Sequence, residues 1–173
     1  MGPRLLIAAT KEAFPDTTSS PAGGLGKREP RTCDHFLSND SPVRLLALAA
    51  TALHGINLLN PQPGDRLLVL GQGPVGQLAA RLARIRGAQV AVVDRNAHRL
   101  AHAEADQIVQ VGEEQPPLNE QIEGGRTAVI EATGSMPALA NSLPLLAQGG
   151  TILLLGYYQT LQLPYMPLFL KEA

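Results

Sequence analysis

The clearest pattern of hydrophobic and polar positions covers residues 65–94, where two short apolar runs flank a segment with helical spacing. The first run, Asp65 to Leu70, stands between a Pro-Gly pair and a glycine, which is typical of a strand buried on both faces of a parallel sheet. From Val75, apolar residues recur every three or four positions until a glycine stop, and this periodicity predicts a helix. A second strand is predicted over Ala88 to Val93, with Asp94 at its end. The unit is therefore a strand, a turn, a helix and a strand.

Further elements are predicted on both sides of this unit. A Ser-Pro pair followed by a broad apolar face predicts a helix from Pro42 to about Leu59. Downstream we expect three strands, over Gln107 to Val111, Thr127 to Ala132 and Thr151 to Leu155. Two helices are expected, over Arg95 to Ala103 and Met136 to Leu146. Gly112 to Arg126 is predicted to be a loop-rich connection, and Met166 to Leu170 is a last apolar segment. Alternating strands and helices predict an α/β fold with a doubly wound, mostly parallel sheet, the Rossmann fold. No sixth strand is evident, so we expect the sheet to be incomplete at its C-terminal edge.

The first forty residues differ from the rest in composition. Pro15 to Gly24 is rich in Pro, Ser, Thr and Gly, which punctuate a chain and do not pack, and Lys27 to Arg31 adds solvated charge. We expect residues 1–40 to be irregular or disordered and residues 41–173 to form one domain with the Rossmann fold.

Composition excludes several classes of protein. The 173 residues allow one domain with a sizeable core, and 45% hydrophobic residues with a net charge of -1 are typical of a globular chain. Lys and Arg are scattered and only 3% of residues are aromatic, so nucleic acid binding is not expected. No apolar stretch has membrane-spanning length, and we expect a cytoplasmic protein. Cys33 is the only cysteine, so an internal disulfide is excluded, and we interpret Cys33-Asp34-His35 as a solvated loop.

The turn after the first strand carries a complete G-x-G-x-x-G motif, Gly71-Gln72-Gly73-Pro74-Val75-Gly76. Gly71 permits a tight turn, Gly73 lets a pyrophosphate approach the main chain, and Gly76 lets the helix pack closely on the strand. Pro74 suits the first helical position, and it leaves the neighbouring amides and the positive helix end facing an anion.

Asp94 stands about 20 residues after the motif, where an acid accepts hydrogen bonds from the ribose hydroxyls of NAD and repels the 2′-phosphate of NADP. Arg95 and Arg99 follow it. They are either beside the adenosine, where they soften the preference for NAD, or solvated helix charges. Gly134 and Gly156 end later strands, and each either admits the nicotinamide half of the cofactor or is structural.

Two other interpretations of the glycine turn stay open. One is a tight turn without a ligand. The other is an S-adenosylmethionine site, although methyltransferases usually carry an acid just before the glycines, where this chain has Val69 and Leu70.

Thr51 and His54 lie about one turn apart on the first predicted helix. We interpret Thr51 as bonding back to the helix backbone and His54 as a surface or partly buried histidine. His54 is the only histidine predicted near the crevice, and no catalytic residue is assigned.

In combination, several motifs resemble the medium-chain dehydrogenases and reductases related to alcohol dehydrogenase. They are Thr51-Ala52-Leu53-His54, Pro63-Gly64-Asp65, the glycine turn, Asp94, Glu131-Ala132-Thr133-Gly134 and Leu155-Gly156. The resemblance implies NAD-dependent oxidation of a secondary alcohol, with a small-molecule alcohol or pigment as substrate and a homodimer in the full-length protein. It implies that residues 71–76 hold the pyrophosphate, that Asp94 and Arg99 hold the adenosine, and that Thr51, Ala132 to Gly134 and Leu155 to Tyr157 border the nicotinamide.

The chain departs from the family in two ways. The GroES-like catalytic barrel that precedes the cofactor domain is absent, so we expect an excised cofactor domain that is inactive alone. Zinc enzymes tend to place a cysteine ligand four residues before the threonine, where this chain has Ala47, so we expect no zinc in this chain. Residues 47–52 and 156–173 most resemble the bacteriochlorophyll-synthesis branch of the family, which oxidises a hydroxyethyl side chain. The alternatives are a non-catalytic NAD-binding or assembly module and a fragment of another zinc-type alcohol or polyol dehydrogenase.

Overall fold

A six-stranded parallel sheet forms the centre of the molecule, in the strand order β1-β6-β5-β2-β3-β4. The computed structural model describes residues 4–8 and 42–171. The strands are β1 (Arg4–Ile7), β2 (Arg66–Leu70), β3 (Gln89–Asp94), β4 (Gln107–Gln110), β5 (Arg126–Glu131) and β6 (Leu146–Leu154). The crossover from β4 past β3 and β2 to β5 reverses the winding direction, so the predicted doubly wound α/β sheet is confirmed.

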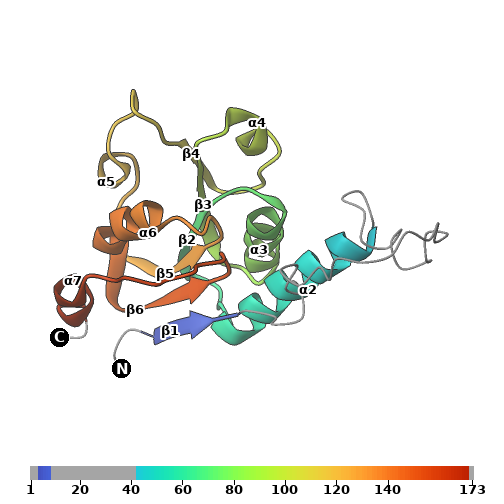
Figure 1. Cartoon of the computed structure of the whole chain (residues 1–173), viewed down its shortest axis with the longest axis horizontal. Helices are drawn as coiled ribbons and strands as arrows, with labels where there is room; N and C mark the ends of the chain where they lie inside the picture. Colours follow the sequence, from blue (N-terminus) through green and yellow to red (C-terminus); the bar gives the residue numbers. More distant parts are fainter. Residues whose placement is uncertain (1–3, 9–41, 172–173) are drawn as a thin grey trace, which may run out of the picture.

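Helices cover both faces of this sheet (Figure 1). They are α2 (Pro42–Leu59), α3 (Pro74–Ile85), α4 (Ala97–Leu100), α5 (Leu118–Gln121), α6 (Met136–Ser142) and α7 (Tyr165–Phe169), with a 3₁₀ turn over Leu143–Leu145. Side chains of α2 and α3 pack on one face, whereas those of α5, α6 and α7 pack on the other. The central strands of the sheet are therefore held in place by helices on both faces.

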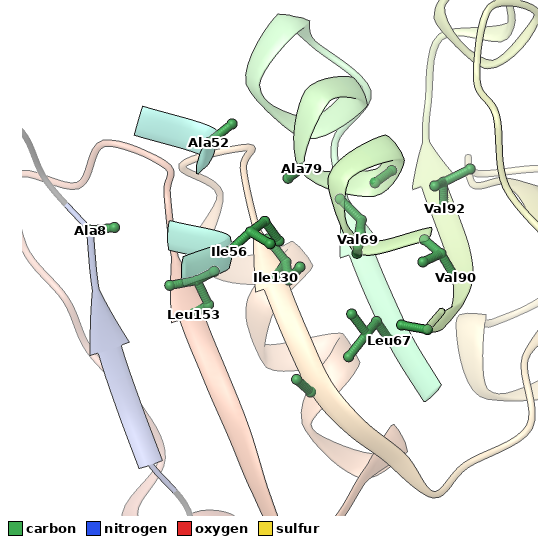
Figure 2. Close-up of a cluster of buried hydrophobic side chains, with 14 of the residues drawn as sticks. Ala8, Ala52, Ile56, Leu67, Val69, Ala79, Val90, Val92, Ile130 and Leu153 are labelled. Atoms are coloured by element: carbon green, nitrogen blue, oxygen red, sulfur yellow. The ribbon is translucent and has the colours of Figure 1, made fainter. Parts of the chain in front are cut away.

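Alternate residues of each central strand enter opposite cores. Leu67 and Val69 join Ile56 of α2 in the first core, and Figure 2 shows these side chains converging. Leu68 and Leu70 enter the second core. All four residues from Leu67 to Leu70 are at most 2% exposed, as predicted for a strand buried on both faces.

Several element boundaries differ from those predicted. The helix over 136–146 ends at Ser142, because Pro144 interrupts it and a 3₁₀ turn follows. Strand β6 then begins at Leu146, five residues early, and the β5–β6 register shifts along this stretch, where Gly149 takes a φ of +64°. Helix α4 begins only after Asn96, whose side chain caps it.

The first strand corrects two predictions. We expected no regular element before residue 41, but Arg4–Ile7 forms β1, which pairs with β6 in parallel. We also expected the sheet to stop at the strand now called β6, but β1 fills the sixth place. The pairing joins ends of the chain that are far apart in sequence, and a four-residue segment with three apolar residues gives no local sign of its partner. Residues 9–40 of the predicted irregular segment lie outside the described residues.

No helix within residues 42–171 is long and apolar enough to cross a membrane. The longest, α2, contains 18 residues.

Candidate functional site

The glycine turn stands at the carboxyl end of β2, the central strand at the switch point of the sheet. Gly71 has a φ of +89°, a conformation that only glycine adopts readily, as the tight turn requires. A Cβ added to Gly76 would lie 1.9 Å from the carbonyl oxygen of Gly71, so α3 packs directly on the turn. The predicted geometric roles of Gly71 and Gly76 are thereby confirmed.

The amide side of the turn is left open. Gly73 caps α3 with a φ of -69°, and a Cβ added there would meet nothing within 4 Å among the described residues. Pro74 occupies the first turn of the helix, as predicted, and it is exposed. The helix end thus presents main-chain N–H groups and its positive dipole to the space beyond the sheet, an arrangement suited to an anion.

Two glutamine side chains brace the turn from inside. Gln72 is fully buried, and its Nε2 donates to the carbonyl oxygen of Gly71 over 3.0 Å. Gln77 Nε2 donates to the carbonyl oxygen of Gln72 over 3.1 Å and reaches that of Arg99 over 3.5 Å, so it ties the turn to α4. Sequence reasoning missed Gln77. No signal in the sequence pointed to it, because Gln77 shares its face of α3 with Arg81 and Arg84, a pattern typical of a solvated helix face.

Asp94 lies directly across from the turn. Its Oδ2 accepts a hydrogen bond from the main-chain N–H of Gln72 over 2.6 Å, and its Oδ1 accepts one from Asn96 over 2.8 Å. The side chain is 8% exposed, and Arg99 Nη1 lies 3.8 Å from Oδ2. The carboxylate therefore points toward the glycine turn and joins the end of β3 to the end of β2.

Arg95 and Arg99 are both exposed beside this acid. The Arg99 side chain remains 55% exposed, so its contact with Asp94 is a surface ion pair that contributes little to stability. Both arginines can therefore turn toward a ligand.

The loop after β5 is held by a second acid. Glu131 is fully buried, and its Oε1 accepts from the N–H of Thr133 over 2.6 Å and from that of Gly134 over 3.1 Å; the Thr133 hydroxyl also donates to it. Its Oε2 shares the Gly134 N–H. The lone pairs of Glu131 are thus directed at its own loop. The sequence marked Glu131 only as part of the Glu131-Ala132-Thr133-Gly134 motif, and its part in holding the loop was not predicted.

Gly134 and Gly156 pack against the neighbouring loop. A Cβ on Gly134 would lie 2.6 Å from the carbonyl oxygen of Tyr157, and one on Gly156 would lie 2.4 Å from Glu131 Oε2. This close packing explains both glycines structurally, and their proposed approach to the nicotinamide stays a prediction. Thr133 and Tyr157 are exposed at the same edge of the sheet.

Thr51 and His54 of α2 agree with their simple interpretations. The Thr51 hydroxyl donates to the carbonyl oxygen of Ala47 over 3.1 Å, one turn back, and His54 is exposed. Neither observation gives either residue a part in chemistry.

A cavity of about 220 Å³ lies at the carboxyl ends of β2, β3 and β4. Its apolar wall includes Leu70, Val93 and Val111, which belong to the second core or pack against it. The cavity is therefore a largely apolar recess at the same edge of the sheet as Asp94, which is not among its lining residues.

Within 4–8 and 42–171, no three or more His, Cys, Asp and Glu side chains form a group that could hold a metal ion. Cys33 lies outside these ranges.

Together, the glycine turn, the helix end and the facing acid at the switch point define a nucleotide-binding class of α/β domain. Residues 74–173 match the family described as zinc-binding dehydrogenase. The chain belongs to this family of medium-chain, alcohol dehydrogenase-like proteins, and the resemblance inferred from the sequence is confirmed.

Relatives share this part of the molecule. The 2-desacetyl-2-hydroxyethyl bacteriochlorophyllide A dehydrogenase of Cereibacter sphaeroides is 38% identical over 132 residues, which are 75% of this chain and 38% of that protein. D-arabinitol dehydrogenase 1 of Uromyces fabae is 30% identical over 136 residues, 69% of this chain and 37% of that protein. Benzyl alcohol dehydrogenase of Acinetobacter calcoaceticus superposes with a TM-score of 0.64 and 28% identity, over 78% of this chain and 41% of that one. The chain thus spans well under half the length of these relatives.

Proposed function

We propose that the carboxyl edge of this sheet binds NAD, as the cofactor-binding part of a secondary-alcohol dehydrogenase. The observation that carries the proposal is the Asp94 carboxylate, which faces the open glycine turn and is held there by the Gln72 N–H. In this proposal the amides around Gly73 to Gly76 receive the pyrophosphate, and Asp94 receives the adenosine ribose.

The hydrogen-bonding capacity of Asp94 supports this role. An ionised carboxylate offers about four lone-pair sites. Main-chain N–H groups occupy one site on each oxygen of Asp94, which leaves a further site on each for the two ribose hydroxyls. Glu131 differs, because it is fully buried and its bonds hold the Thr133–Gly134 loop.

The same acid favours NAD over NADP. A 2′-phosphate would place negative charge against Asp94, and only the exposed Arg95 and Arg99 could offset it. A protein from Sinorhizobium meliloti 1021 with 28% identity and a TM-score of 0.60, over 72% of this chain and 40% of that one, is bound to NADP, so both cofactors need to be tested. The apolar recess at this edge of the sheet suits the adenine ring, which carries no charge.

The cofactor, when bound, supplies the acceptor for a hydride from the alcohol carbon. The chain's own part is to orient that cofactor. Thr133, Gly134, Gly156 and Tyr157 lie on the loops after β5 and β6, where the nicotinamide half is proposed to sit, and the buried Glu131 fixes one of these loops. No residue of the described part is assigned as the base that accepts the hydroxyl proton.

The proposed substrate is the hydroxyethyl side chain of a bacteriochlorophyll precursor, oxidised to an acetyl group. The similarity to the Cereibacter sphaeroides enzyme over 75% of this chain supports it. A polyol is the second candidate, because the D-arabinitol dehydrogenase and the L-galactonate-5-dehydrogenase of Escherichia coli are 30% and 34% identical. We propose a small-molecule alcohol or pigment in either case.

Titration of the chain with NADH, followed by the fluorescence of the nicotinamide, tests the binding proposal. We expect saturable binding, and we expect Asp94→Ala to weaken it about tenfold or more, because two charge-assisted hydrogen bonds to the ribose are lost. Asp65→Ala is the matched control. Its carboxylate also accepts a main-chain N–H, that of Gln62 over 2.7 Å, but at the amino end of β2. Equal affinity of the Asp94→Ala variant and the original chain contradicts the ribose role.

Three further measurements separate the alternatives. Binding of S-adenosylmethionine with indifference to NADH supports methyl transfer. Binding of NADH without turnover by the full-length protein supports a non-catalytic module. Comparison of hydroxyethyl-bacteriochlorophyllide with arabinitol in the presence of NAD or NADP decides between the substrate classes and between the cofactors.

A further inference from the structure

A second cluster of polar side chains lies at the opposite edge of the sheet. The first residues of four neighbouring strands are all long and polar: Arg66 of β2, Gln89 of β3, Gln107 of β4 and Arg126 of β5. Because the strands are parallel, their amino ends meet at one edge, away from the glycine turn. These residues line an open cavity of about 490 Å³, together with Asp106, Gln121 and Glu123.

Arg126 is a buried cation in this cavity. It is 6% exposed, its Nε donates to the carbonyl oxygen of Glu123 over 3.2 Å, and its Nη2 donates to Gln107 Oε1 over 3.2 Å. Both acceptors are neutral. None of the ion pairs among residues 42–171 includes Arg126. Burial and then the charge of Arg66 lower its pKa, whereas the charge of Glu123 acts on it without forming an ion pair and raises it; the guanidinium stays charged at neutral pH.

The two acids that line the cavity are directed elsewhere. Asp106 bonds to the N–H of Val90 over 2.8 Å and pairs with Arg84 over 3.5 Å. Glu123 pairs with Arg66 over 3.2 Å, but its side chain is 89% exposed, so this pair is easily displaced. A buried charge is normally paired, and here the wall of an open cavity holds one that lacks a carboxylate partner.

We propose that this cavity binds a small oxyanion, a phosphate or a carboxylate group, between Arg126 and Arg66. The planar N–H donors of two guanidinium groups match the oxygens of such anions. Glu123 then acts as an internal competitor, because it occupies Arg66 when the anion is absent. The site lies at the edge of the sheet opposite the NAD site and does not depend on it.

Calorimetric titration of the whole chain with inorganic phosphate and with malonate, at constant ionic strength, tests this proposal. We expect saturable binding of at least one anion, and the anion that binds more tightly identifies the phosphate or the carboxylate source. Arg126→Gln is expected to weaken binding about tenfold or more, since a buried charged donor is lost. Arg81→Gln removes the same charge from a surface ion pair with Glu104 and is expected to leave binding unchanged.

Glu123→Gln gives the sharper result. It removes the competitor for Arg66, so it is expected to tighten anion binding about threefold, as loss of a surface ion pair allows. A purely structural role of Glu123 would not strengthen binding. If Arg126→Gln does not fold, Arg66→Gln, at a half-exposed position, is expected to weaken binding by a similar factor without changing NADH affinity. The proposal is overturned if neither anion binds. It is also overturned if the anion affinity of Arg126→Gln is unchanged or, where that variant does not fold, if the anion affinity of Arg66→Gln is unchanged. Unchanged or weaker anion affinity in Glu123→Gln overturns it as well.

Discussion

Substitution of Gly76 by alanine tests the packing on which the candidate site rests. The added Cβ would lie 1.9 Å from the carbonyl oxygen of Gly71 and 2.9 Å from its carbonyl carbon. Both atoms belong to the backbone of a tight turn with a positive φ, so no side chain can rotate away to make room. Either α3 or the turn has to move.

The size of the effect follows from this distance. Real Cβ contacts are essentially never below 3.0 Å, so the helix and the turn must separate by more than 1 Å. Overpacking of a core typically costs 1–3 kcal/mol, and a contact with rigid backbone belongs at the upper end of about 3 kcal/mol. Alanine favours a helix by about 1 kcal/mol relative to glycine, which offsets part of this cost. We therefore expect a net loss of about 2 kcal/mol in the free energy of unfolding, or a fall in Tm of roughly 4–8 °C.

Gly73→Ala is the matched control on the same turn. A Cβ there meets nothing within 4 Å among the described residues, and the φ of -69° suits any residue. Its stability cost is limited to a poorer helix cap, about 1 kcal/mol or less. Its methyl group nevertheless projects toward the proposed pyrophosphate, so NADH affinity should fall about tenfold or more, as expected when a diphosphate loses close contact with the amides.

Urea denaturation followed by circular dichroism, together with NADH titration, distinguishes the two variants. Gly76→Ala should lose both stability and NADH affinity, whereas Gly73→Ala should lose mainly affinity. Equal stability of Gly76→Ala and the original chain would refute the packing argument. Unchanged NADH affinity in Gly73→Ala would refute the placement of the pyrophosphate.

Two other predictions concern stability. The Tyr158 hydroxyl is buried beside the Glu131 carboxylate, but no hydrogen bond of ordinary geometry joins it to a described residue. Burial first, and then the polar and charge interactions with Glu131, raise its pKa. Because the folded pKa lies above the unfolded value of about 10, the free energy of unfolding does not depend on this group below about pH 10 and falls as the pH rises beyond it. Tyr158→Phe should raise the free energy of unfolding at pH 7 by about 1 kcal/mol and remove the fall in stability above pH 10. The control Tyr165→Phe, at a position 70% exposed, should change neither the stability at pH 7 nor its pH dependence. If Tyr158→Phe keeps the original pH dependence of stability, Tyr158 is not the group responsible for it. In β1, Leu6 packs on the first core, whereas Ile7 is 60% exposed. Leu6→Asp should therefore lower the free energy of unfolding, measured by urea denaturation, by about 2–3 kcal/mol, and Ile7→Asp should lower it by about 1 kcal/mol or less. Equal losses in the two variants would show that β1 does not pack as an edge strand.

The sequence predicted those parts of the fold that local patterns determine. The strand over Leu67 to Leu70, the glycine turn and the acid at Asp94 lie within thirty residues, and each has a signature that depends only on its neighbours. Strand β1 has no such signature, because a short apolar run becomes a strand only when β6 offers it an edge. The bracing by Gln77 and Glu131 was also invisible. A glutamine on a helix and an acid at a strand end gain their roles only through the distances in the folded chain.

The two edges of the sheet differ in how their chemistry is encoded. At the carboxyl edge, the donors offered to a ligand are main-chain amides, and glycines in one short motif set their geometry. Such a site can be predicted from spacing, since any residue supplies an N–H once the turn is formed. At the amino edge, the groups are side chains of Arg66, Gln107 and Arg126, which come from separate strands and belong to no motif. Each of them alone is typical of a solvated strand end, and only the parallel order of the strands brings them to one cavity. A site of the second kind must therefore be inferred from burial and charge in the folded structure, where Arg126 stands out as a buried cation facing neutral acceptors.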